Sequence, residues 1–151
     1  MAATTAGQAV GLTVQEMARR SGFSEPTLRY YEKIGLLGAV ARDESSGHRR
    51  YEPATVARVE ALSCLRSAGM TVSGMRRYLE LLAQGHSAAA EQRDLFATQA
   101  EKLAADVEQL QLRLTYLRRK TDLWDARVRG DAIAENRAAE AITRVLEEFT
   151  Y

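Results

Sequence analysis

Two clusters of basic side chains are the residues of this sequence whose types and spacing suggest chemistry. Arg29, Tyr30 and Lys33 share one face of a helix, because positions three and four apart are neighbours on a helix surface. A guanidinium, a phenol and an ammonium are groups that contact phosphates and base edges in a major groove. The second cluster follows soon after and consists of Arg42, His48, Arg49 and Arg50. The first cluster alone also fits an ordinary solvated helix face, but the two together favour nucleic-acid binding.

The first cluster lies on the second of two short predicted helices. Thr13 and Glu16 have the spacing of a capping box at the start of the first helix, and Gly22 is expected to end it. Ser24 is expected to cap the second helix, which is predicted to run to Ile34. Two short helices joined by a turn that contains glycine are typical of a helix-turn-helix.

The second cluster lies in a segment with a different pattern. Residues 36–51 have short β-capable flanks around a polar, glycine-containing tip, which predicts a small hairpin. A third helix is expected over 53–69 and a fourth over 71–85. Ser87 is expected to cap the last and longest helix.

That longest helix carries a continuous apolar pattern that no glycine or proline interrupts. Its apolar positions alternate at spacings of four and three, which is typical of a coiled-coil seam. The seam consists of Phe96, Ala100, Leu103, Val107, Leu110, Leu114, Leu117, Thr121, Trp124 and Val128. It would extend for roughly 50 Å, too far to be buried against the rest of one chain, so we expect self-association. Gly130 ends this pattern, and Asp131 is expected to cap a short final helix.

The composition excludes several classes of function. The formal net charge of +1 is unevenly divided: residues 1–85 hold 11 Lys/Arg and 8 Asp/Glu, whereas residues 86–151 hold 10 and 12. A single cysteine rules out an internal disulfide, fits the reducing cytoplasm, and leaves too few Cys and His side chains for a structural zinc site. No apolar run reaches the length of a membrane span. No nucleophile–base pair, phosphate loop or metal cluster suggests an enzyme, and no cofactor is expected.

Four stretches of the sequence form a more specific pattern. They are TVQEMARRSGFS at 13–24, TLRYYEKIGLL at 27–37, SGHRRY at 46–51 and LRSAGM at 65–70. This pattern resembles the MerR family of bacterial transcription regulators. The composition predicts a mainly helical chain, and the small, uncharged residues at its start predict a flexible tail over 1–11. The resemblance implies a winged helix-turn-helix DNA-binding domain over 12–84. It further implies an antiparallel coiled-coil dimerisation helix over 86–129 and a C-terminal helix within 130–151, a candidate effector region.

The resemblance also implies a mechanism and a set of contacts. Members of the family bind a pseudo-palindromic operator as homodimers, and they bend and untwist an over-long promoter spacer so that RNA polymerase engages both promoter elements. The implied contacts to double-stranded DNA are Thr13, Arg20, Ser24, Thr27, Arg29, Tyr30, Lys33, Arg42, His48, Arg49, Arg50 and Tyr51. Tyr51 is expected to be partly structural. The implied dimer seam includes Leu103, Val107, Leu110, Leu114 and Leu117.

The sequence leaves the effector that triggers such a regulator open. Ser87 and residues 126–135 stand where metal-sensing members carry cysteines, so a thiolate metal sensor is excluded. Cys64 lies on a face of small residues, which fits a packing role, and Glu60 one turn earlier opposes formation of a thiolate. Its position before Leu-Arg-x-x-Gly-Met nevertheless resembles the branch of the family that senses aldehydes or other electrophiles through one thiol. The rival trigger is a small-molecule pocket at the end of the coiled coil, with walls formed by Tyr116, Trp124, Phe149 and Tyr151.

A second class of function also fits the pattern. An architectural or partner-binding coiled-coil protein without an effector response would share the helices and the seam. The two classes differ in what the basic clusters do, because Arg29→Ala and Arg49→Ala abolish operator binding only in a regulator that reads DNA with these residues.

Overall fold

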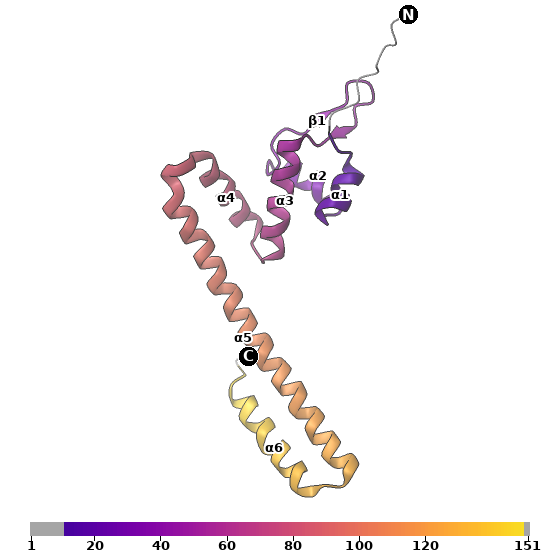
Figure 1. The fold of residues 1–151 in the computed structure, drawn as a ribbon, viewed down its shortest axis with the longest axis vertical. Coiled ribbons are helices and arrows are strands. Elements are labelled where there is room, and N and C mark those ends of the chain that lie inside the picture. The colour runs from indigo at the N-terminus through magenta and orange to yellow at the C-terminus, as the bar shows by residue number, and fades with distance from the viewer. Residues whose placement is uncertain (1–10, 150–151) are drawn as a thin grey trace, which may run out of the picture. The chain divides into compact units, whose positions relative to one another are not determined.

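A computed structural model describes residues 11–149 of the chain and is mainly helical (Figure 1). The chain forms two compact units, the first running to Gln99 and the second beginning at Ala100. The expected long helix followed by a short C-terminal helix is confirmed. The expected flexible tail falls largely on residues 1–10, which lie outside the described residues.

Helices α1 (Val14–Ser21) and α2 (Glu25–Lys33) form the expected helix-turn-helix. The capping box of α1 is complete: the Thr13 hydroxyl accepts from the Glu16 N–H, and the Glu16 carboxylate accepts from the Thr13 N–H. The Ser24 hydroxyl caps α2 in the same way. These local hydrogen bonds satisfy backbone donors that helix starts leave free, which explains why both helices begin where the sequence places them.

The expected hairpin consists of two strands of two residues each. β1 (Ala41–Arg42) pairs antiparallel with β2 (Arg49–Arg50). Directly after β2, the backbone of Tyr51 exchanges two hydrogen bonds with that of Leu12. A side chain at Gly11 would place its Cβ 2.9 Å from the Tyr51 carbonyl oxygen, so glycine allows this close approach. The start of the described chain is therefore held against the end of the wing, by which we mean residues 41–50.

Two further helices complete the first unit, α3 (Pro53–Ser67) and α4 (Val72–Gln84). One apolar core joins them to α1, α2 and the segment around the wing. Its fully buried members are Met17, Leu28, Leu36, Tyr51, Val59, Leu62, Met70 and Met75. Because α2 directs Leu28 and Tyr31 into this core, its opposite face is left to solvent.

The transition to the long helix differs from the sequence expectation. α4 is followed by a 3-10 turn, η1 (Gly85–Ala88), and only then by α5 (Ala89–Arg129). The prediction that Ser87 caps α5 is wrong, because Ser87 lies within the turn and its hydroxyl donates to the Gln84 carbonyl at 3.0 Å. The Ala89 N–H donates to the carbonyl of His86, so the turn itself supplies the acceptor that a cap would have provided.

The second unit is a helical hairpin made from the later part of α5 and from α6 (Ala132–Glu147). Asp131 caps α6, as expected, by accepting from the Ala134 N–H at 2.9 Å. A small core of Leu123, Ala138 and Ile142 holds α6 against α5. Figure 1 shows α6 folding back alongside the later part of α5. α6 therefore covers one face of α5.

Candidate nucleic-acid interface

A groove of about 360 Å³ brings three separate elements to one place. It is bordered by the start of α1, the exposed face of α2 and the wing. The predicted DNA-binding residues that line it are Thr13, Arg29, Arg42, His48, Arg49 and Arg50. Four guanidinium groups and an imidazole thus border a single hollow, a concentration suited to the phosphates of a nucleic-acid backbone.

The exposed face of α2 lies beside this groove. Arg29 is about half exposed (50%) and pairs with Glu25 one turn earlier at 3.1 Å. Exposed pairs of this kind contribute about 0–1 kcal/mol, so the guanidinium is readily available to a stronger acceptor. Tyr30 is also half exposed, at 51%, and Lys33 is exposed and has no ion pair among residues 11–149. This face therefore offers the side chains that the sequence predicted.

Glu32 is a residue of this site that the sequence analysis missed. Its carboxylate accepts a short hydrogen bond from Nε of Arg49 and lies 3.7 Å from the guanidinium of Arg42. The Glu32 side chain is only 18% exposed, so this contact is partly shielded from water. Glu32 thereby ties the wing to the last turn of α2. A single carboxylate within a basic stretch is the signal that could have identified it.

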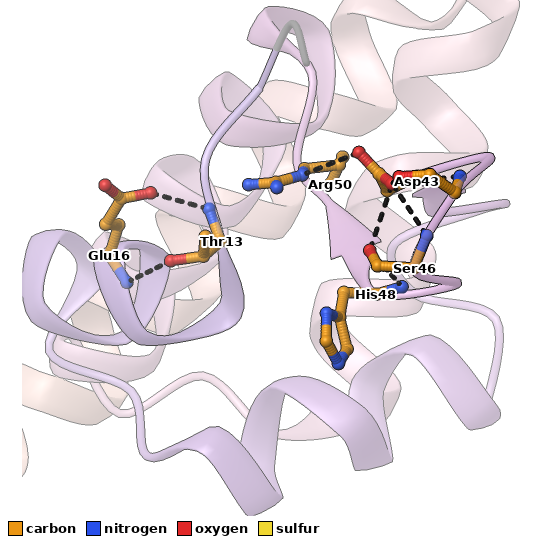
Figure 2. Close-up of polar contacts among 7 residues, drawn as sticks. Thr13, Glu16, Asp43, Ser46, His48 and Arg50 are labelled. Atoms are coloured by element: carbon orange, nitrogen blue, oxygen red, sulfur yellow. Dashed lines mark hydrogen bonds and ion pairs between the residues drawn. The ribbon is translucent and has the colours of Figure 1, made fainter. Parts of the chain in front are cut away.

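Asp43 holds the tip of the wing closed. Its carboxylate accepts hydrogen bonds from the backbone N–H and the hydroxyl of both Ser45 and Ser46, at distances of 2.6 to 3.1 Å. These bonds, led by the Ser45 hydroxyl, keep the pKa of the Asp43 carboxyl well below its ordinary value. Asp43 also lies 3.8 Å from Nε of Arg50. Figure 2 shows Arg50 extending from this acidic contact toward the capping box of Thr13 and Glu16.

The capping box contributes a second ionised carboxylate beside the groove. The pKa of Glu16 is lowered chiefly by the hydrogen bond from the Thr13 backbone N–H, and more weakly by the charge of Arg50. Wing and α1 are therefore connected by electrostatics as well as by the Leu12–Tyr51 backbone contact.

Six of the twelve predicted contacts do not line the groove: Tyr30 and Lys33 on the α2 face, Tyr51, and Arg20, Ser24 and Thr27. Arg20 places its Nε 2.6 Å from the carboxylate of Glu60 on α3, beside a separate hollow of about 430 Å³. Ser24 and Thr27 lie at the start of α2, where their hydroxyl oxygens are 2.8 Å apart. For these residues except Tyr51, as for those that line the groove, DNA contact stays a prediction.

Tyr51 requires a correction, because it is completely buried in the core of the first unit. The expectation that Tyr51 is partly structural is confirmed, but its place among the DNA contacts is wrong since none of its side chain reaches the surface. Burial raises the pKa of its hydroxyl, which has no hydrogen-bond partner among the described residues. The buried Tyr51 side chain therefore anchors the end of the wing in the core of the first unit.

Cys64 is exposed on α3 and is not part of the core of the first unit. The carboxylate of Glu60, one turn earlier, is paired with Arg20.

The aromatic pocket expected at the end of the coiled coil is not assembled as predicted. The rings of Tyr116 and Phe149 meet edge-on with centroids 5.7 Å apart. Trp124 belongs instead to the exposed seam face, where the Arg127 guanidinium lies 4.7 Å from its ring. The reason is helix geometry, because Tyr116 lies on the face that α6 covers and Trp124 does not. Tyr151 lies outside the described residues.

The second unit has a charged hollow of about 420 Å³ beside α6. It is lined by Arg119, Asp122, Asp125, Arg129, Ala134, Arg137, Ala138 and Ala141. Two of its guanidinium groups already pair with its two carboxylates, at 3.2 and 3.3 Å.

Over residues 11–149 there is no group of three or more His, Cys, Asp or Glu side chains placed to hold a metal ion. None of the described helices is long and apolar enough to span a membrane.

Comparison with known proteins identifies the fold. The sequence profile of the MerR HTH family regulatory proteins matches residues 12–82. An uncharacterised HTH-type transcriptional regulator of Haemophilus influenzae is 31% identical over 125 residues, which cover 82% of this chain and 92% of that protein. The HTH-type transcriptional regulator AdhR of Bacillus subtilis is 28% identical over 92 residues, which cover 61% of this chain and 65% of AdhR.

Solved structures agree with the sequence comparisons. HiNmlR, a MerR family regulator lacking the sensor domain, was crystallised bound to promoter DNA. It is 31% identical with a TM-score of 0.70, and the match covers 83% of this chain and 95% of HiNmlR. A putative MerR family transcriptional regulator from Listeria monocytogenes is 27% identical with a TM-score of 0.68, over 86% of this chain and 98% of that one. These relatives are regulators rather than enzymes, as the sequence analysis expected. The chain therefore belongs to the MerR family of DNA-binding helix-turn-helix transcriptional regulators.

Proposed function

We propose that this chain acts in the cytoplasm as a homodimer that binds a pseudo-palindromic promoter through two copies of the basic groove and of the α2 face. The observation that carries this proposal is the groove itself, where Arg29, Arg42, Arg49 and Arg50 converge from α2 and the wing. Guanidinium groups fit phosphate oxygens in two-pronged contacts, and the major groove of B-DNA is wide enough to admit an α-helix such as α2. The crystal structure of HiNmlR with promoter DNA supports the same use of the related fold.

In this proposal three segments of the chain have separate roles. Residues 12–84 bind DNA, residues 86–129 join two copies, and residues 130–149 support the end of the long helix. The exposed apolar row on α5 supports the second assignment, since its leucines and valine between positions 103 and 117 are 44–61% exposed. A contiguous exposed apolar surface of this kind is typical of an interface.

The proposed mechanism is deformation of the promoter. Each wing holds the backbone that flanks its half-site, and the dimer bends and untwists the spacer so that RNA polymerase engages both promoter elements. Such deformation costs of the order of 1–6 kcal/mol, which the additional contacts offset. Because the net charge is only +1, the non-specific electrostatic attraction to DNA is small. The affinity therefore depends on binding two half-sites at once.

We further propose Cys64 as the trigger. Its exposure on α3 allows an aldehyde or another electrophile to reach the sulfur. With an aldehyde, the sulfur bonds to the carbonyl carbon and the thiol proton passes to the oxygen. A small molecule in an aromatic pocket is less favoured, because Trp124 does not join Tyr116 and Phe149.

The interface assignment is tested with Arg29→Ala and Arg49→Ala on an operator selected from random duplexes by the wild-type protein. Both variants are expected to lose operator binding while sedimentation equilibrium still shows the dimer. Arg66→Ala is the matched control, because Arg66 is exposed on α3 outside the groove. Wild-type affinity in both groove variants would make the regulator assignment of these residues wrong and favour an architectural protein.

A further inference from the structure

The hydroxyl of Tyr51 is a buried polar group that the fold leaves without a hydrogen bond. The Tyr51 side chain is completely inaccessible to solvent, and its oxygen has no hydrogen-bond partner among residues 11–149. Buried donors without a partner are rare in native proteins, because such a group gives up its hydrogen bonds to water and gains none in return. A phenylalanine ring would fill the same space in the core, so packing does not account for the hydroxyl.

Two elements bring this hydroxyl close to the carboxylate of Glu32. Arg49 and Tyr51 are two positions apart along β2 and the bridge that follows it, so their side chains lie on the same side of the strand, and Arg49 contacts Glu32. On α2, Leu28 packs in the same core as Tyr51, and Glu32 lies one turn further along. Burial raises the pKa of the Tyr51 hydroxyl, and the negative charge of Glu32 raises it further. The hydroxyl therefore lies within reach of the electrostatic field of this carboxylate.

Glu32 already has two other partners in the free protein. Its carboxylate accepts a short hydrogen bond from Nε of Arg49 and lies 3.7 Å from the guanidinium of Arg42. Both arginines also line the basic groove, where the phosphates of DNA compete for them. The Glu32 side chain is only 18% exposed, so water cannot fully replace the positive charge that moves away. DNA binding therefore leaves Glu32 in need of another donor.

We propose that Tyr51 is a positioning residue for DNA binding, whose hydroxyl donates to Glu32 when Arg42 and Arg49 turn to phosphates. This inference rests on the proposed DNA interface and identifies what makes the two wing arginines available to it. The hydroxyl stays protonated and the carboxylate stays ionised, so only hydrogen-bond partners are exchanged. Tyr51 itself does not contact the DNA.

Tyr51→Phe tests this exchange, because it removes the hydroxyl and keeps the ring in the core. The hydroxyl has no partner in the free protein, so the melting temperature is not expected to fall. The affinity for the selected operator is expected to fall at least about tenfold, since each subunit of the complex loses a hydrogen bond to a charged group. Tyr78→Phe is the matched control, because Tyr78 is a half-buried tyrosine on α4 that does not line the groove. Its affinity is expected to stay within about threefold of the wild type.

Glu32→Gln separates the exchange from a general loss of packing around Tyr51. Glutamine carries no charge that requires compensation, so in this background Tyr51→Phe is expected to change operator affinity by less than about threefold. The same tenfold loss in both backgrounds, or wild-type affinity in Tyr51→Phe, would overturn the exchange. If Arg49→Ala still loses operator binding in that case, the proposed interface stands. Wild-type binding by Arg49→Ala would instead contradict the interface itself.

Nuclear magnetic resonance of tyrosine labelled with carbon-13 at Cζ observes the hydroxyl directly. The Tyr51 resonance is identified by its absence from Tyr51→Phe. It is expected to shift when the operator binds, because the hydroxyl becomes a donor to the Glu32 carboxylate, and to shift much less in Glu32→Gln. An unmoved resonance in the wild-type complex, or an equal shift in Glu32→Gln, would overturn the exchange.

Discussion

Arg42→Gln isolates one phosphate contact of the proposed interface with little effect on the fold. The Arg42 side chain is half exposed, lies 3.7 Å from Glu32 and donates to the Gly47 carbonyl at 3.2 Å. Contacts of this kind contribute up to about 1 kcal/mol to stability, so the variant is expected to remain folded. What changes is one positive charge at the groove in each copy.

The size of the effect follows from counterion release. Each neutralised phosphate contributes about 0.9 to the slope of log affinity against log salt concentration. A homodimer carries the substitution twice, so the slope is expected to become shallower by about 1.8. Between 50 and 200 mM salt, this difference changes the ratio of wild-type to variant affinity by about tenfold, and the variant is relatively weakest at low salt.

Fluorescence anisotropy of a labelled operator across that salt range measures the slope. Arg66→Gln removes the same charge from α3, outside the groove, and is expected to leave the slope near the wild-type value. An unchanged slope for Arg42→Gln, or an equal change in both variants, would refute the assignment of Arg42 to a phosphate contact.

Two further substitutions test the residues that hold the wing, and a third tests the proposed trigger. Glu32→Gln removes the negative charge of a largely buried carboxylate that pairs with the wing arginines. The free energy of unfolding is expected to fall by about 1–2 kcal/mol, because the losses known for ion pairs are smaller at the surface and larger in the interior. Calorimetry measures this loss, and an unchanged melting temperature would contradict the role of Glu32 as the tie between α2 and the wing. Asp43→Asn is expected to speed amide hydrogen exchange at Ser45 and Ser46. Because the folded pKa of Asp43 is depressed, its contribution is present above the unfolded value of about 3.9 and is lost as pH falls through the lower folded value. If the amides of Ser45 and Ser46 exchange equally fast in the wild type and in Asp43→Asn at pH 4, this role of the Asp43 carboxylate is contradicted. Cys64→Ser is expected to abolish promoter activation by formaldehyde or methylglyoxal while operator affinity is kept, and a wild-type response would eliminate the thiol trigger.

The parts of the fold that the sequence predicted depend on neighbours along the chain. The capping box of Thr13 and Glu16 and the cap at Asp131 join residues three positions apart, so residue type alone identifies them. The face of α2 follows from periodicity in the same way, because burying Leu28 and Tyr31 exposes Arg29 and Tyr30.

The parts that were missed depend on how distant segments meet. Glu32 contacts Arg49 seventeen positions later, and that contact exists only once the wing has folded back on α2. Tyr51 has a residue type that could face DNA, but the bridge to Leu12 turns it into the core. Ser87 has a good capping side chain, but the turn before α5 already supplies a backbone acceptor. Tertiary placement decided the outcome for Glu32 and Tyr51, whereas Ser87 is the exception, because a local turn decided it.

Hydroxyl-radical footprinting on the selected operator tests the central claim most directly, namely that two copies of the groove and the α2 face hold DNA. We predict two protected clusters related by a pseudo-dyad on one face of the duplex, with flanking protection that the wings provide. Arg49→Ala, examined at a concentration that still saturates the operator, is expected to lose the flanking protection at both ends. A single unpaired cluster, or the same flanking protection in Arg49→Ala as in the wild type, would contradict the account.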